Sequence, residues 1–156
     1  MYQNRQNRGD HGERGYQNSG AELQKIVSYI ENDQGDPLSI FGLSGVVHAM
    51  ANSASGNKTK SHQLRRFYDY LVSIDDSLRS EEKGGKGEKI AKLRLIRMIP
   101  LAAYSASPSR RLLDGNLSDF IGKSAQAVSG KTGKEFKEAL SRFRDVYEAL
   151  VAYSKG

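Results

Sequence analysis

The sequence predicts an all-α protein: a single helical bundle of five to six helices with a disordered basic N-terminal tail. Apolar residues recur at helical spacing in five or six segments, and no segment shows convincing strand alternation. Residues 1–18 contain no Leu, Ile, Val or Phe, so they cannot bury enough apolar surface to offset the entropy of ordering. We therefore expect a disordered tail over residues 1–18 and a helical bundle domain over residues 19–156.

Two helices are expected before residue 60. Ser19 and Glu22 have the spacing of a capping box, which predicts that a helix begins there. Asp36-Pro37 should end that helix, because proline cannot continue it. A second, weaker helical stretch carries apolar residues from Leu43 to Met50, and the small polar residues 52–59 predict a loop.

The third and fourth helices have different apolar patterns. The third has one apolar stripe, formed by Leu64, Phe67, Tyr68, Leu71, Ile74 and Leu78. The Gly-rich residues 83–87 follow it as a connection. Residues 88–106 are apolar on most sides, which is typical of a helix at the centre of a domain. The fourth helix is therefore expected to be the central one.

The last two helices are amphipathic. The fifth is predicted by Leu113, Leu117, Phe120, Ile121 and Val128, and a turn follows at residues 130–133. The sixth has one apolar face, formed by Phe136, Leu140, Phe143, Tyr147, Leu150 and Val151. Both should bury these faces in the core of the bundle.

The charge and the cysteine content restrict the class of protein. The chain has 24 Lys and Arg against 18 Asp and Glu, a formal net charge of +6 that favours polyanionic partners. Nucleic acid is the first expectation, and an anionic membrane surface is the alternative. The absence of cysteine excludes disulfides and thiolate metal sites and suits the cytoplasm, where we expect the protein. No apolar run approaches the roughly 18 residues of a membrane span.

The sequence contains no arrangement typical of an enzyme. Residues 125–132 match a relaxed phosphate-loop pattern, but a helix precedes them where that chemistry requires a strand. The three histidines are scattered and have no metal-ligand spacing. Asp75 and Asp76 are helical neighbours that point about 100° apart, so we do not expect them to share a site. We predict no catalytic activity, no metal and no cofactor.

Basic residues gather around the start of the third helix and along the fourth. Arg66 is predicted to face solvent, and Gln63 lies on the flank of the apolar stripe with its amide free. Arg94 and Arg97 lie on an otherwise apolar helix, so they must reach a carboxylate, the surface or a phosphate. The candidate RNA-binding residues are Lys58, Lys60, Gln63, Arg65, Arg66, Lys92, Arg94 and Arg97.

Three segments resemble one known family. Residues 61–67, Ser-His-Gln-Leu-Arg-Arg-Phe, resemble the Thr-Ser-Gln-Ile-Arg-Lys/Asn-Phe/Leu start of a helix in the small subunit of type III-A CRISPR effector complexes, the Csm complexes. Residues 92–104 resemble that family's Lys-Leu-Lys…Pro-x-Leu-Ala-Tyr segment, and residues 143–153 resemble its C-terminal helix. After the Ala-Tyr pair the family continues to Gly-Arg, whereas this chain has arginines only later, at Arg110 and Arg111.

The resemblance implies a non-catalytic helical bundle in an antiviral ribonucleoprotein. Its implied partners are the target single-stranded RNA and the CRISPR RNA, the backbone and large polymerase-like subunits, and other copies of itself. RNA cleavage would belong to the backbone subunit. Two alternatives stay open from the residues alone: a stand-alone helical nucleic-acid-binding protein, and a purely structural protein-interaction bundle.

Overall fold

The computed structural model describes residues 20–56, 61–80 and 86–154, and all of its regular structure there is helical. A first helix covers residues 20–32. It is followed by α2 (Pro37–Phe41), α3 (Val46–Gly56), α4 (Ser61–Ser80), α5 (Lys86–Ser105), α6 (Gly115–Ser129) and α7 (Gly133–Tyr153). The prediction of an all-α bundle is confirmed over these residues, whereas the predicted tail and Ser19 lie outside them.

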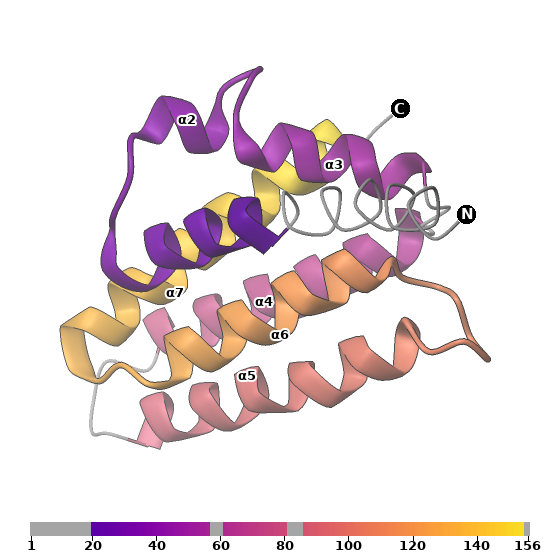
Figure 1. The fold of residues 1–156 in the computed structure, drawn as a ribbon. Coiled ribbons are helices and arrows are strands. Elements are labelled where there is room, and N and C mark those ends of the chain that lie inside the picture. The colour runs from indigo at the N-terminus through magenta and orange to yellow at the C-terminus, as the bar shows by residue number, and fades with distance from the viewer. Residues whose placement is uncertain (1–19, 57–60, 81–85, 155–156) are drawn as a thin grey trace, which may run out of the picture.

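The central helix is α7. It packs against α3, α4 and α6 (Figure 1). Its predicted apolar face is buried almost completely, with Phe136, Leu140, Phe143 and Tyr147 at 0% exposure. Aromatic rings meet at the middle of this face, where Phe120 of α6 approaches Phe143 edge-on at 5.8 Å between centroids.

The expectation of a central fourth helix is wrong. This helix is α5, which packs mainly against α4 and α6 and lies at an edge of the bundle (Figure 1). Ala91, Leu95, Met98 and Ala102 face inward, whereas other large apolar side chains of α5 remain exposed. The apolar residues of α5 therefore lie on two faces of the helix. One face is buried against the rest of the bundle, and the other is exposed.

The region before residue 57 differs in detail from the prediction. The chain ends its first helix before Asp36-Pro37 as expected, but a short helix, α2, then begins at Pro37. The Asp36 carboxylate caps α2 by accepting a hydrogen bond from the Ser39 amide at 3.3 Å. Leu43 lies outside any helix, and α3 continues through residues 52–56, which had been expected to form a loop.

The first and last helices are joined by more than apolar packing. Ile26 and Ile30 of the first helix are fully buried in the common core. At the end of that helix, the Arg142 guanidinium of α7 donates hydrogen bonds to the carbonyl oxygens of Ile30 at 2.9 Å and Glu31 at 3.3 Å. The last carbonyl oxygens of a helix have no hydrogen-bond partner within the helix, so a cation beside them stabilises the helix end.

Tyr147 ties α7 to the start of α4. Its hydroxyl is buried and donates a 2.7 Å hydrogen bond to the Leu64 carbonyl oxygen, and burial raises the pKa of Tyr147 well above its usual value. The Tyr147→Phe substitution should lower the free energy of unfolding by about 1 kcal/mol, because it removes one buried hydrogen bond and little packing. The midpoint of unfolding in urea measures this change. An unaltered midpoint would show that the Tyr147 hydroxyl does not stabilise the fold.

Candidate nucleic-acid interface

The start of α4 lies beside the end of α5. A short connection joins the two helices, so they run antiparallel, and residues near Ser61 meet residues near Ser105. The Gln63 amide nitrogen donates a 2.8 Å hydrogen bond to the Ser105 hydroxyl, and both residues are buried. The expectation of a free Gln63 amide is therefore wrong, because this amide joins the two helices.

A groove opens at this junction. Its volume is about 260 Å³, and its walls come from α4, from the end of α5 and from the segment that follows. The lining residues are Gln63, Arg66, Phe67, Tyr70, Leu101, Tyr104, Ser105 and Arg110. Two of these carry a positive charge and none carries a negative one, so the groove attracts anions.

Arg110 and Tyr104 form one wall of the groove. The Arg110 guanidinium carbon lies 4.8 Å from the centroid of the Tyr104 ring, and its Nη1 lies 3.4 Å from the tyrosine hydroxyl, to which it donates. Tyr104 is 57% exposed. Neither residue was among the RNA-binding residues predicted from the sequence. The signal that could have found them is the short α4–α5 connection, which brings the residues after α5 back to the start of α4.

The structure separates the predicted basic residues. Arg65 and Arg66 are exposed on α4, as predicted for Arg66, and Arg97 is exposed on the outer side of α5. Of these three, Arg66 lines the groove. Lys58 and Lys60 lie outside the described residues.

Arg94 and Lys92 have partners inside the protein. The Arg94 guanidinium donates a 2.6 Å hydrogen bond to the Ser73 hydroxyl and lies over the Tyr70 ring at 5.0 Å. Within the described residues, a serine hydroxyl and an aromatic ring are therefore the partners of Arg94, which remains half-buried. Lys92 pairs with Glu88 at 3.4 Å and lies 5.3 Å from the Phe136 ring centroid.

The two neighbouring carboxylates on α4 do share a partner. Arg144 of α7 donates from one nitrogen to Asp75 at 3.0 Å and to Asp76 at 3.1 Å. The expectation that Asp75 and Asp76 would not share a site is wrong in this respect, because a long side chain from another helix reaches both. The hydrogen bond that Arg144 donates to Asp75 raises the pKa of Arg144. This cluster is an ion pair between helices, without a nucleophile.

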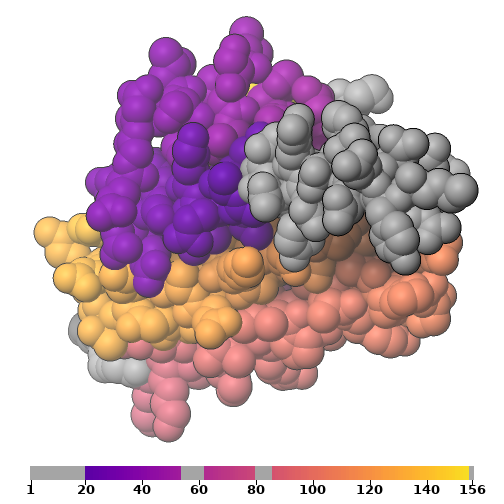
Figure 2. Space-filling model, viewed as in Figure 1, coloured from indigo at the N-terminus to yellow at the C-terminus, as the bar shows by residue number. Residues whose placement is uncertain are grey.

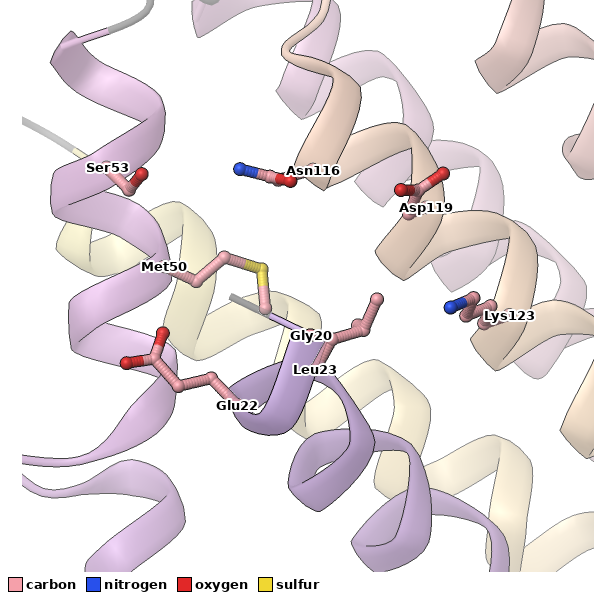
Figure 3. A pocket seen from close by; sticks show the side chains of 8 residues that line it. All are labelled: Gly20, Glu22, Leu23, Met50, Ser53, Asn116, Asp119 and Lys123. Carbon is pink, nitrogen blue, oxygen red and sulfur yellow. The ribbon is translucent and has the colours of Figure 1, made fainter. Parts of the chain in front are cut away.

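A second hollow of about 160 Å³ lies between the first helix, α3 and α6. Figure 3 shows Asn116, Asp119 and Lys123 on one helix facing Met50 and Ser53 on another, with Glu22 and Leu23 from the first helix. Charges of both signs line this hollow, so it has no preference for a polyanion. The groove at the α4–α5 junction is the better candidate.

Over the described residues, no helix is long and apolar enough to cross a membrane. In the same part of the chain, no three His, Cys, Asp or Glu side chains gather as a metal-binding group would require.

The fold and the groove define a class: small, basic, all-α bundles with two arginines in one surface groove. The comparison with protein families gives the particular family. Residues 42–156 match the family described as Csm2 Type III-A. The match covers well over half of the chain, so the chain belongs to the Csm2 family and is a structural subunit of the type III-A Csm complex. No curated protein and no solved structure matches it.

Proposed function

We propose that this subunit contacts RNA in the type III-A complex and catalyses no reaction itself. The RNA is the target strand together with the CRISPR RNA that guides the complex. The observation that carries the proposal is the groove at the α4–α5 junction, where Arg66 and Arg110 stand without a carboxylate among the lining residues. Phosphate oxygens are the matching ligands, because arginine donates to them in a fixed, often bidentate geometry.

The contacts should be mainly to phosphate and sugar. A subunit repeated along arbitrary guide–target pairs must tolerate every sequence, and backbone contacts carry no sequence information. Arg65, Arg66 and Arg110 form the proposed centre of this surface, and Arg97 extends it along α5. Lys58 and Lys60 precede α4 and are proposed to join it. Gln63 and Arg94 join α4 to α5, and Lys92 pairs with Glu88 within α5, so these three residues are proposed to support the surface through the packing of the two helices.

The other partners follow from membership of the complex. We propose contacts with the backbone subunit, the large polymerase-like subunit and further copies of this chain, in the cytoplasm. Cleavage of RNA would then belong to the backbone subunit. A stand-alone nucleic-acid-binding protein would bind RNA but would not copurify with a guide RNA, so sequencing the RNA that copurifies with the complex separates these two functions.

The test of the RNA surface is an Arg66→Glu, Arg110→Glu double variant. Its affinity for single-stranded RNA should fall by about tenfold or more. The slope of log affinity against log salt should become shallower by about 1.4, because each lost phosphate contact accounts for about 0.7. Binding is measured by fluorescence anisotropy at several salt concentrations, after circular dichroism has confirmed folding.

The matched control is a Lys123→Glu, Lys137→Glu double variant. Both lysines are exposed, neither lines the groove, and the change in net charge is the same. The control should keep most of the affinity and of the salt slope. Equal losses in the two variants would mean that only net charge matters, and no loss in the first would refute this surface.

A further inference from the structure

The groove at the α4–α5 junction has more apolar surface than phosphate contacts require. Half of its lining residues are aromatic or aliphatic, namely Phe67, Tyr70, Leu101 and Tyr104. Phosphate oxygens are bound by N–H and O–H donors, so the two arginines account for the charge of the groove but not for these apolar walls. The walls indicate that the ligand also has an uncharged, apolar part.

Tyr104 is the exposed aromatic side chain of the described structure. Among residues 20–56, 61–80 and 86–154, every other aromatic ring is buried or half-buried, whereas Tyr104 is 57% exposed. Leu101 lies about one helical turn earlier on the same side of α5 and is 48% exposed. Isolated exposed apolar residues are ordinary, but contiguous ones that line a groove mark a site of interaction.

Arg110 holds the Tyr104 ring in position. Its guanidinium carbon lies 4.8 Å from the ring centroid, and its Nη1 donates to the tyrosine hydroxyl at 3.4 Å. These two contacts restrict the motion of the ring before any ligand binds, which lowers the entropy cost of binding. Since Tyr104 remains 57% exposed beside Arg110, the ring keeps surface for a second planar group.

The size and the polar groups of the groove fit one nucleobase of any kind. Its volume is about 260 Å³, below the roughly 300 Å³ at which sites for drug-sized ligands begin. The Gln63 amide nitrogen is occupied by the Ser105 hydroxyl, so it is not free to select one base by its edge. A ring face accepts every base, because every base has a π-face.

The groove lies at one end of the bundle. In Figure 1, the end of α5 and the connection to α6 form the right-hand end of the molecule. The space-filling view shows this part of the chain at the surface (Figure 2). A long strand can therefore run past this end without entering the bundle.

We propose that the groove binds one unpaired nucleotide of the RNA, whose base stacks on Tyr104 and whose phosphate is held by Arg66 and Arg110. This inference rests on the proposed function and adds a base contact to the phosphate and sugar contacts given there. Stacking on an aromatic ring tolerates every sequence, so it suits a subunit repeated along arbitrary RNA. The nucleotide is unpaired because a base in a duplex is already stacked between its neighbours.

The test compares variants of the full chain on two RNA strands of equal length, a labelled oligouridine and its abasic counterpart. Tyr104→Ala should bind the oligouridine about tenfold more weakly than the parent. It should bind the abasic strand as the parent does, because that strand has no base to stack. Tyr104→Phe keeps the ring and should retain most of the affinity. Leu93→Ala truncates a similarly exposed side chain of α5 outside the groove and is the control. Fluorescence anisotropy measures binding after circular dichroism has confirmed folding.

Tyr104→Trp provides a direct spectroscopic readout. The natural chain has no tryptophan, so the emission of this variant reports on position 104 alone. The oligouridine should quench this emission, because a base stacks on the indole ring, whereas the abasic strand should leave it nearly unchanged. An emission that both strands change equally would contradict the stacking contact, even if Tyr104→Ala failed to fold.

Three other results would overturn the proposal: a Tyr104→Ala variant that binds the oligouridine like the parent, a loss that is equally large on the abasic strand, or an equal loss in Leu93→Ala. Uridine monophosphate that binds as tightly as the oligouridine would also overturn it and would assign the groove to a free nucleotide. Failure of the RNA function is distinguishable. A parent that binds no RNA would refute both proposals, whereas a loss confined to the Arg66→Glu, Arg110→Glu variant would refute the base contact alone.

Discussion

The Phe143→Ala substitution should lower the free energy of unfolding by about 3–5 kcal/mol, the largest effect expected of a single truncation here. Phe143 is fully buried on the central helix and contacts the rings of Phe120 and Tyr147, with centroids 5.8 and 6.4 Å away. Removing the ring leaves a cavity between α6 and α7 that rigid helices cannot close completely. Urea titration followed by circular dichroism measures the loss.

Leu93→Ala provides the matched control for this core truncation. Leu93 is 58% exposed on the outer side of α5, so its truncation should change the free energy of unfolding by no more than about 0.5 kcal/mol. Both titrations are run at low protein concentration, so that contacts between copies do not contribute. A loss below about 1 kcal/mol for Phe143→Ala would contradict its place in the core.

The Arg144→Met substitution should cost about 2–3 kcal/mol. The Asp75 side chain is only 3% exposed, and removing Arg144 leaves its carboxylate with Arg79, which is itself 63% exposed. Breaking a fully buried ion pair typically costs about 3–5 kcal/mol. The expected value is lower because Arg144 is 28% exposed and Arg79 remains. The free energy of unfolding in urea, compared with the parent, gives the cost.

Two further variants separate the ion pair from other effects. Arg79→Met removes the exposed partner of Asp75 and should cost at most about 1 kcal/mol. Adding Asp75→Asn to Arg144→Met should recover part of the stability, since the stranded negative charge is then gone. Equal costs for Arg79→Met and Arg144→Met would show that the contact between α4 and α7 adds nothing beyond a surface pair.

Helical periodicity predicted the helices well where one face of a helix is buried. The stripes of α4, α6 and α7 were found because burial in a bundle selects apolar residues at three- and four-residue spacing. The five-residue helix α2 is too short to show this period. Asn52 and Ser53 lie in the last turns of α3, so their polarity marked exposure and not the end of the helix.

The position of α5 could not be predicted from the same signal. An apolar residue in the sequence indicates a side chain that is buried or can be buried. It does not indicate whether this chain or another molecule buries it. Leu95 is covered by this chain, whereas Leu93, two residues away, is not. Periodicity alone reads both as core, so an edge helix with an exposed apolar face was taken for the central one.

The candidate site was only partly predictable, since its polar groups depend on partners distant in sequence. The exposure of Arg66 follows from its angle to the stripe on its own helix. In contrast, Gln63 is occupied by Ser105, 42 residues away, and Arg94 is occupied by Ser73. The position of Arg110 in the groove depends on the antiparallel pairing of α4 and α5, which only the short connection between these helices could have indicated.

The hydrogen bonds from Arg142 to the end of the first helix show that the folded core begins before the segment that matches the family. The family match begins at residue 42, yet Ile26 and Ile30 fill the same core as α7. A fragment trimmed to the matched segment would expose the surface that these side chains cover and would leave Arg142 without the Ile30 and Glu31 carbonyls. The hydrophobic core is therefore larger than the matched segment, and residues before residue 42 are as much a part of the folded subunit as those after it.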